Sequence, residues 1–203
     1  TAENIAKKWG ITRDDQDALA LESHLRAERA TAQGRFTDQI VPIMLKTHKG
    51  EVAYATDEHF RTGATAEDFS KLKPVFIKEN GTVTAGNASG INDAAAAVVL
   101  MDAQVAQQRG LKPMARLVAY AHAGVDPAYM GIGPVPATQK ALAKAGLTVA
   151  DLDVIEANEA FAAQSLAVIR DLGLDPAIVN PLGGAIALGH PLGATGAIRV
   201  ATL

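Results

Sequence analysis

The sequence predicts an α/β protein in which helices cover both faces of a parallel or mixed sheet. Beyond Gly90, short apolar stretches alternate with helical stretches of about 10 to 15 residues, which is the pattern of βαβ units. Of the 203 residues, 48% are hydrophobic but only 4% aromatic, and 18 are glycines. This composition favours closely packed helices joined by tight turns.

Helices are predicted where apolar side chains recur at helical spacing and a turn signal closes the stretch. In chain order they span residues 2–9, 13–34, 102–109, 134–145, 159–171 and a stretch starting near Gly193. Asp14 and Asp15 put negative charge at the start of the second helix, where the helix dipole favours it. Gly110, Gly146 and Gly173 end the next three, because glycine readily takes the left-handed conformation of a helix end.

Strands are predicted where short apolar or alternating stretches are bounded by turn residues. In chain order they span residues 36–43, 115–121, 154–156 and 178–180. Residues 46–84 are polar and punctuated by glycine, so we expect irregular structure there. Residues 1–86 are therefore expected to form a separate domain with little sheet of its own.

Composition and charge exclude several classes of protein. A net charge of −3 and a pI near 5.9 provide no basic stripe for a phosphate backbone, so nucleic-acid binding is set aside. No apolar run approaches the roughly 20 residues of a membrane span, and no signal-peptide pattern opens the chain, so we expect a soluble cytoplasmic protein. Cysteine is absent, which excludes disulfides, thiolate metal sites and a cysteine nucleophile within this chain. No metal site is expected. Because the sequence does not begin with methionine, we expect that it starts inside a longer protein.

The segment of residues 180–197 holds five glycines and one histidine, His190. Its glycines let the backbone turn sharply and approach a ligand closely, and Pro191 stiffens the chain beside the histidine. The helix expected to start near Gly193 should disfavour the imidazolium with its positive end. We therefore expect a rigidly held, neutral imidazole that can accept a proton or donate a hydrogen bond.

Two other interpretations of this segment compete with a catalytic one. A lone histidine is more often a satisfied core residue than a catalytic group. A glycine-rich loop can also bind a dinucleotide, but the Gly-x-Gly-x-x-Gly pattern is absent, and His190 and Pro191 would stand where the pyrophosphate approaches. The dinucleotide interpretation is therefore the least favoured.

Two further segments place polar side chains where ligands commonly bind. Asn158 follows a predicted strand, and the carboxyl ends of strands are the usual ligand edge of an open α/β sheet. Its amide can either cap the next helix or hold a catalytic water. Residues 82–93 are small and polar, so they form either a simple turn or a passage in which Ser89 meets the amide groups of a ligand.

These segments together resemble the thiolases in order and spacing. They read Thr84-Ala-Gly-Asn-Ala-Ser-Gly-Ile-Asn-Asp, Asn158-Glu-Ala-Phe-Ala and Gly183-Gly-Ala-Ile-Ala-Leu-Gly-His-Pro-Leu-Gly-Ala-Thr-Gly. Any one of them would be a weak signal. With Thr1-Ala-Glu-Asn-Ile-Ala and Met130-Gly-Ile-Gly-Pro-Val-Pro-Ala, the resemblance covers nearly the whole chain and is highly specific.

The resemblance implies a thiolase-like layered α-β-α half with part of an inserted loop domain, truncated at both ends. Residues 1–89 would belong to the loop domain, which holds part of the coenzyme A site. Residues 90–109 would close the amino-terminal half, and residues 110–203 would form an incomplete carboxy-terminal half. A homodimer or homotetramer is implied for the intact protein, and the isolated chain would be poorly soluble because it exposes apolar surface.

The resemblance also implies roles for particular residues. His190 would activate the nucleophilic thiol and polarise the thioester carbonyl, and Asn158 would position the water that completes this oxyanion site. Arg61 would lie near the nucleotide phosphates of coenzyme A, and Ser89 on its pantetheine amides. The apolar positions implied along the adenine, pantetheine, tunnel and acyl pocket are Leu72, Val75, Phe76, Ala85, Ile91, Met130, Ala160 and Phe161. Plain core packing is the competing explanation for each apolar member.

The activity implied is that of an acyltransferase of fatty acid metabolism, which cleaves 3-ketoacyl-CoA thiolytically or runs the reverse Claisen condensation of acetyl-CoA. Its two cysteines, one accepting the acyl group and one shuttling a proton, would lie outside this chain. Coenzyme A is then a substrate, and no tightly bound cofactor is expected. For this chain alone, a non-catalytic CoA-binding or interaction module is the alternative. Residues 188–199 lean towards a degradative rather than a biosynthetic member.

Overall fold

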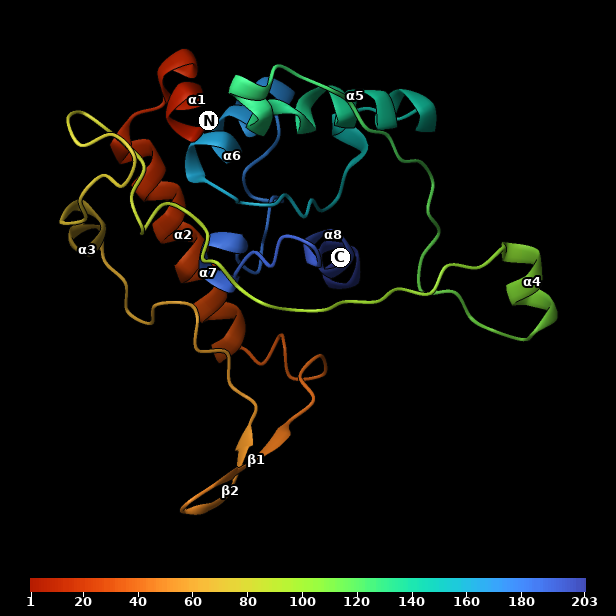
Figure 1. Ribbon diagram of the computed structural model, residues 1–203. Helices are drawn as coiled ribbons and strands as arrows, with labels where there is room; N and C mark the ends of the chain where they lie inside the picture. Colours follow the sequence, from red (N-terminus) through yellow and green to blue (C-terminus); the bar gives the residue numbers. More distant parts are fainter.

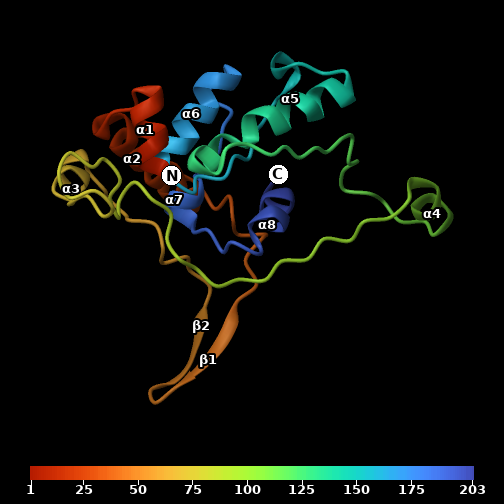
Figure 2. The ribbon, with the colours of Figure 1, turned by 45° about the horizontal axis from the view of Figure 1, so that its top comes forward.

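The computed structural model describes all residues from 1 to 203, and helices make up most of its regular structure. The α-helices are α1 (Ala2–Trp9), α2 (Arg13–Ala32), α3 (Ala66–Ser70), α4 (Ala103–Gln108), α5 (Pro134–Ala145), α6 (Ala162–Leu172), α7 (Ala185–Leu188) and α8 (Thr195–Thr202). Two 3-10 helices, η1 (Pro127–Ile132) and η2 (Val149–Asp151), flank α5. Helices α1 and α2 both pack against α6, and α7 lies beside α2 (Figure 1 and Figure 2).

The helices predicted from the sequence are present, and the glycines expected at the ends of three of them are confirmed. The start of α2 carries the acidic residues expected there and also a capping pair that was not predicted. Thr12 caps α2, because its hydroxyl accepts the Asp15 N–H at 3.1 Å while the Asp15 carboxylate accepts the Thr12 N–H at 3.0 Å. Gly110, Gly146 and Gly173 follow α4, α5 and α6 with φ angles of 65°, 68° and 62°. These left-handed conformations are the ones that glycine was expected to supply.

Helix α6 is the one whose predicted start was wrong, because it begins at Ala162 rather than at Glu159. The residues before it stay extended, since their backbone pairs with another segment of the chain. Thus the Ser89 N–H donates to the carbonyl oxygen of Ala160 at 3.1 Å. The consequence is that Asn158 lies outside the helix, in an extended approach to it.

The only ladder of paired strands is the antiparallel hairpin of β1 (Ile43–Thr47) and β2 (Gly50–Tyr54). The sequence prediction was wrong here, because it put a strand at residues 36–43 and irregular structure from residue 46 onward. Residues 33–39 form turns instead. Every residue of the hairpin is exposed, so no alternation of buried and exposed side chains marks its strands in the sequence.

The strands predicted at residues 115–121, 154–156 and 178–180 do not assemble into a sheet. Ile155 and Val179 form a single parallel bridge, whereas residues 115–121 form no backbone pairing. A strand requires a neighbour whose backbone groups bond along its length. In both views the chain between residue 91 and η1 runs as an extended loop that carries α4 away from the other helices (Figure 1 and Figure 2), so it meets no such neighbour.

Two small clusters of buried side chains form the core. The first joins α1 to α6 and contains Ile5, Ala6, Ile11, Ala163 and Ala167. The second joins α2, α3, α6 and α7 and contains Ala20, Phe69, Ala162 and Ile186. Their many alanines let helix backbones approach closely. Helix α6 contributes to both clusters, so the core fixes the segment that leads into α6. Helix α7 contributes to the second cluster and thereby fixes the loop that follows α7.

Large apolar side chains are exposed away from this core, on the hairpin and along the extended loop. Examples are Val41, just before the hairpin, and Val99 and Met114 on the loop, at 83%, 89% and 103% relative exposure. Such surface favours association with other chains, so poor solubility of the isolated chain stays a prediction. None of the helices combines the length and the apolar character needed to span a membrane.

Candidate functional site

The three polar segments singled out in the sequence meet in space. Ala88 pairs with Phe161 in an antiparallel bridge, and Ile91 pairs with His190 in a parallel bridge. Residues around 90 therefore run between the segment that leads into α6 and the loop that follows α7. This arrangement brings Asn158, Ser89 and His190 to one region although they are far apart in the sequence.

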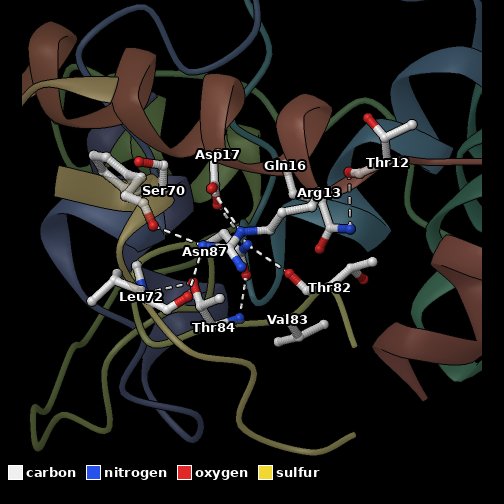
Figure 3. Close-up of polar contacts among 12 residues, drawn as sticks. Thr12, Arg13, Gln16, Asp17, Ser70, Leu72, Thr82, Val83, Thr84 and Asn87 are labelled. Carbon is white, nitrogen blue, oxygen red and sulfur yellow. Dashed lines mark hydrogen bonds and ion pairs between the residues drawn. The ribbon is translucent and has the colours of Figure 1, made fainter. Parts of the chain in front are cut away.

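Asn87 anchors the first of these segments to α2 (Figure 3). Its side-chain nitrogen donates to Asp17 Oδ1 at 2.8 Å and to the Thr82 carbonyl oxygen at 3.0 Å, while its Oδ1 accepts the Thr84 N–H at 2.8 Å. Asp17 is itself paired with Arg13 at 2.7 Å. A fully buried amide with all these partners fixes the backbone that leads to Ser89.

His190 is held from two sides. Its backbone N–H donates to Asn92 Oδ1 at 3.0 Å. Its ring atom Nδ1 lies 2.7 Å from the Oγ1 atom of Thr195, which is in the first turn of α8. Gly189 precedes it with φ 99°, a conformation that other residues rarely adopt. The rigidly held imidazole expected from the sequence is thus present in the structure.

The pKa of His190 lies below its ordinary value, first because the ring is partly buried and second because the Arg199 guanidinium repels the imidazolium. The neutral imidazole expected from the sequence is therefore favoured. The cause expected from the sequence was the positive end of a helix near Gly193; α8 does begin at Thr195, beside the ring, and its contribution stays a prediction. Arg199 belongs to α8 and forms an ion pair with Glu156 at 2.7 Å, with only 12% and 5% of the two side chains exposed.

Asn158 lies directly beside His190. Its side-chain nitrogen is 3.3 Å from Nε2 and 3.4 Å from Nδ1 of the ring. Its Oδ1 is buried and has no hydrogen-bond partner in the protein. The capping alternative is wrong, because Phe161 occupies the N-cap position of α6 and Asn158 makes no cap bond. Its amide is therefore free to bind a polar group beside the imidazole.

Glu159, the neighbour of Asn158, is a buried carboxylate that the sequence reasoning missed. It accepts hydrogen bonds from Ser23 Oγ at 2.7 Å, from Asn180 Nδ2 at 2.9 Å and from the Ile186 N–H at 3.2 Å. Burial raises the pKa of the Glu159 carboxyl, and these three donors oppose that rise. The carboxylate ties α2, the Asn158 segment and α7 together.

Asn180 completes this support. Its side chain forms two bonds with the backbone of Ala157, donating to the carbonyl oxygen at 2.7 Å and accepting the N–H at 2.8 Å. Its own backbone is left-handed, with φ 47°. Asparagine is among the few residues that tolerate this conformation, and that preference is the one sequence signal that pointed to a special role.

Two neighbouring cavities contain most of the predicted substrate-binding residues. One, of about 590 Å³, is lined by Ser89, Ile91, Met130, Ala160, Phe161 and His190. The other, of about 750 Å³, is lined by Arg61, Leu72 and Ala85. Gly90 belongs to the walls of both cavities. Asn158 lines a third cavity of about 360 Å³, whose wall includes Met130 and Ala160.

Val75 and Phe76 line none of these cavities. The Phe76 ring lies edge-on to the ring of Phe161, with centroids 6.3 Å apart, and Val75 is exposed. The Ser89 hydroxyl donates to the Ala160 carbonyl oxygen at 3.0 Å. The substrate contacts of all these residues stay predictions. No group of three or more histidine, aspartate or glutamate side chains is arranged to hold a metal ion.

Comparison with known proteins matches nearly the whole chain to the two domains of one protein family. The model of the thiolase amino-terminal domain matches residues 1–104, and that of the thiolase carboxy-terminal domain matches residues 111–203. The beta-ketothiolase BktB of Cupriavidus necator is 67% identical over 198 residues, which cover 98% of this chain and 50% of that protein. An acetyl-CoA acetyltransferase of Rhizobium meliloti is 59% identical over 203 residues, covering 100% of this chain and 51% of the relative.

Solved structures agree with these matches. An acetyl-CoA acetyltransferase from Bacillus anthracis superposes with a TM-score of 0.94 at 51% identity, covering 100% of this chain and 51% of its own. Human mitochondrial 3-ketoacyl-CoA thiolase superposes with a TM-score of 0.91 at 47% identity, with the same coverage of both chains. The chain therefore has the fold expected from the sequence resemblance, and it spans about half the length of the relatives it matches.

Proposed function

Because the chain belongs to the thiolase family, we propose that it supplies His190 and Asn158 to the active site of an acyltransferase. The reaction is thiolytic cleavage of 3-ketoacyl-CoA by coenzyme A, or the reverse Claisen condensation of acetyl-CoA. The observation that carries the proposal is the pairing of Asn158 with His190, at 3.3 Å, beside the cavity that Ser89 and Phe161 line. The named activities of the relatives support it.

In the proposed mechanism His190 is the base. A cysteine thiol, which this chain lacks, gives its proton to the imidazole, and the thiolate attacks the keto carbonyl of the substrate. The bond between C2 and C3 then breaks, leaving the acyl group on the cysteine and the enolate of acetyl-CoA, which takes a proton from a second cysteine. The second cysteine, now a thiolate, takes the proton of a new coenzyme A thiol, whose sulfur attacks the acyl-enzyme. Acyl-CoA is released, and the leaving cysteine takes back its proton from the His190 imidazolium.

Asn158 assists by holding a water beside the imidazole. The water and His190 together form an oxyanion site that stabilises negative charge on the carbonyl oxygen. Support comes from the buried Oδ1 of Asn158, which has no partner in the protein and can accept a hydrogen bond from such a water. The low pKa of His190 keeps the ring neutral between turnovers, so that it can accept the thiol proton.

Coenzyme A binds, in this proposal, across the two cavities that meet at Gly90. Arg61 attracts the nucleotide phosphates, and Ser89 meets the pantetheine amides. The apolar residues of the prediction line the path between them: Leu72, Val75, Phe76, Ala85, Ile91, Met130, Ala160 and Phe161. Coenzyme A acts as a substrate, and no tightly bound cofactor takes part.

The remaining parts of the proposal rest on family resemblance. Residues 1–89 form the loop domain, residues 90–109 close the amino-terminal half, and residues 110–203 belong to the carboxy-terminal half. The boundary between the two matched domain models, at residues 104–111, supports a division near there. A cytoplasmic location, a homodimer or homotetramer and a role in fatty acid metabolism stay predictions.

The test replaces His190 with alanine in a polypeptide of full family length that contains this sequence. Thiolysis of acetoacetyl-CoA is measured, and we expect a loss of about a hundredfold or more in kcat, as for removal of an oxyanion donor. His48→Ala is the control, because His48 is exposed in the turn of the hairpin, which projects away from α7 and α8 (Figure 1). Activity of His190→Ala within about tenfold of the parent would contradict the proposal.

A second candidate applies to the isolated polypeptide. Because it has no cysteine, it can act alone only as a non-catalytic module that binds coenzyme A or another protein. Calorimetric titration of the isolated chain with coenzyme A separates these cases. Binding without turnover supports a CoA-binding module, and no binding favours a role in protein interaction.

A further inference from the structure

Thr195 bonds to the ring of the proposed base. Its Oγ1 lies 2.7 Å from His190 Nδ1, and its hydroxyl donates to the Pro191 carbonyl oxygen at 2.9 Å. The side chain is in the first turn of α8, and the residue is 94% buried, with only 6% of its surface exposed. A buried hydroxyl between a carbonyl oxygen and a ring nitrogen has few other partners available.

The number of protons available determines the direction of each bond. A threonine hydroxyl has one proton and two lone pairs. If that proton goes to the Pro191 carbonyl oxygen, Oγ1 can only accept from the ring, so Nδ1 must carry the imidazole proton. In a neutral imidazole the other nitrogen, Nε2, is then left with a free lone pair.

Asn158 lies beside the same ring. Its side-chain nitrogen is a donor, 3.3 Å from Nε2 and 3.4 Å from Nδ1, so by distance it can donate to either ring nitrogen. Because Nδ1 already has Thr195 Oγ1 at 2.7 Å, Nε2 is the nitrogen left to accept from the amide when the ring proton is on Nδ1. The position of Asn158 is therefore compatible with the tautomer that the Thr195 contacts select.

We propose that Thr195 is a positioning residue that keeps the proton of His190 on Nδ1 and so leaves Nε2 as the basic nitrogen. The inference rests on the proposed function, because it identifies which ring nitrogen receives the proton of the nucleophilic thiol. In that step the S–H bond breaks, the Nε2–H bond forms and a thiolate remains. The Nδ1–H bond to Thr195 persists in the resulting imidazolium, which the acceptor Oγ1 stabilises.

The alternative arrangement reverses the hydroxyl. Thr195 would donate to Nδ1, and the ring proton would sit on Nε2, where it could only donate. That arrangement leaves the Pro191 carbonyl oxygen with the N–H groups of Ala194 and Thr195, at 2.8 Å and 2.9 Å. A ring of this kind cannot take the thiol proton at Nε2, so the two arrangements differ in a quantity that can be measured.

The first experiment measures the tautomer directly. Histidine labelled with ¹⁵N in the imidazole is incorporated into the full-family-length polypeptide, and two-bond ¹H–¹⁵N correlations identify the protonated nitrogen of His190. His190→Asn identifies its signals. We expect the proton on Nδ1 in the parent protein. A proton on Nε2 would overturn the inference, whatever the activity of the enzyme.

The second experiment uses three variants that separate positioning from folding. Thr195→Val removes the hydroxyl, and Thr195→Ser keeps it. Thr202→Val is the matched control, because Thr202 lies in the same helix and its hydroxyl donates to the Ile198 carbonyl oxygen at 3.0 Å, a bond of the same type without a histidine. Thermal unfolding of all three shows whether each variant folds.

We expect Thr195→Val to lower kcat for thiolysis by roughly tenfold or more and to populate both tautomers, since general base catalysis depends on the correct protonation state. Thr195→Ser should remain within about threefold of the parent, and Thr202→Val within about twofold. A folded Thr195→Val variant with parental kcat and a single Nδ1–H tautomer would contradict the inference. If Thr195→Val does not fold, the tautomer of His190 in the parent protein and the kcat of Thr195→Ser still test the inference. Parental activity in His190→Ala would instead contradict the proposed function.

Discussion

The side-chain nitrogen of Asn158 lies 3.3 Å from Nε2 of His190, although 32 residues separate the two along the chain. They come from different segments, one leading into α6 and the other following α7. The bridge between Ile91 and His190 and the carboxylate of Glu159 hold these segments together. The pair is therefore a product of tertiary packing, and it gives rise to the following predictions.

Replacing Asn158 with alanine should lower kcat for thiolysis by roughly 10²- to 10³-fold, the usual cost of losing an oxyanion-site group. Thermal stability should change little, because Asn158 Oδ1 has no partner in the protein to lose and the contact between the side-chain nitrogen and the His190 ring is long, at 3.3 Å. Asn4→Ala serves as the control, since Asn4 is exposed and its side chain only donates to the Ala128 carbonyl oxygen. Steady-state kinetics of folded variants measure the effect, and a kcat equal to that of the control would argue against the water-binding role.

Replacing Glu159 with alanine should destabilise the protein by about 3 kcal/mol or more, because three buried donors lose their acceptor at once. Ser23→Ala removes one of these donors and also leaves the buried Gly184 N–H without its acceptor, so it should cost about 2 kcal/mol. Glu67→Ala is the control on an exposed glutamate, whose ion pair with Lys71 contributes little. Urea unfolding gives all three values. Equal effects of the Glu159 and Glu67 replacements would show that the buried carboxylate does not hold the site together.

The charge of Arg199 should shift the pH profile of catalysis. Partial burial and Arg199 lower the pKa of His190, so the neutral base persists below the ordinary value of 6.5, and kcat/KM should fall only as the pH drops through that lowered pKa. Removing the charge raises the pKa, so the acid limb should move to higher pH. The double variant Glu156→Leu with Arg199→Met is the one to measure, because Arg199→Met alone leaves the buried Glu156 carboxylate unpaired, at a cost of about 3 to 5 kcal/mol. An acid limb that does not move would exclude this electrostatic influence.

His24 should make the folding stability depend on pH. Burial, followed by the charges of His59 and Arg61, lowers its pKa from 6.5 to about 4. The unfolded chain therefore binds this proton more readily than the folded one, so the stability is complete above pH 6.5 and is lost as the pH falls towards 4. Between pH 7 and pH 5 we expect a loss of about 1 to 2 kcal/mol, somewhat below the full value of the shift because solvent screens part of the site.

The check on His24 compares urea midpoints at pH 7 and pH 5. In the parent protein His24 Nδ1 accepts a hydrogen bond from the backbone N–H of Arg61 at 3.0 Å. The side-chain oxygen of asparagine can accept the same bond without titrating. His24→Asn should therefore lose most of the pH dependence. His122→Asn, at an exposed position, should keep it. The same slope in both variants would assign the pH dependence to other groups.

Local signals in the sequence predicted much of the fold. The acidic residues Asp14 and Asp15 at the start of α2 and the glycines after α4, α5 and α6 act within one helical turn, so their effect can be read without knowing what packs nearby. The strands were predicted less well, because pairing depends on a second segment elsewhere in the chain. The hairpin was missed because its exposed residues show no buried face, and residues 115–121 find no partner.

The sequence by itself determined which chemical groups the site contains: a glycine-bounded histidine, an asparagine after a strand and a small polar segment, in an order that resembles the thiolases. Only the tertiary structure decided that Asn158 lies beside His190, that Glu159 is buried under three donors and that Thr195 reaches Nδ1. The physical reason is that side-chain identity is fixed residue by residue, whereas burial, hydrogen-bond partners and the position of a proton depend on atoms that only folding brings together.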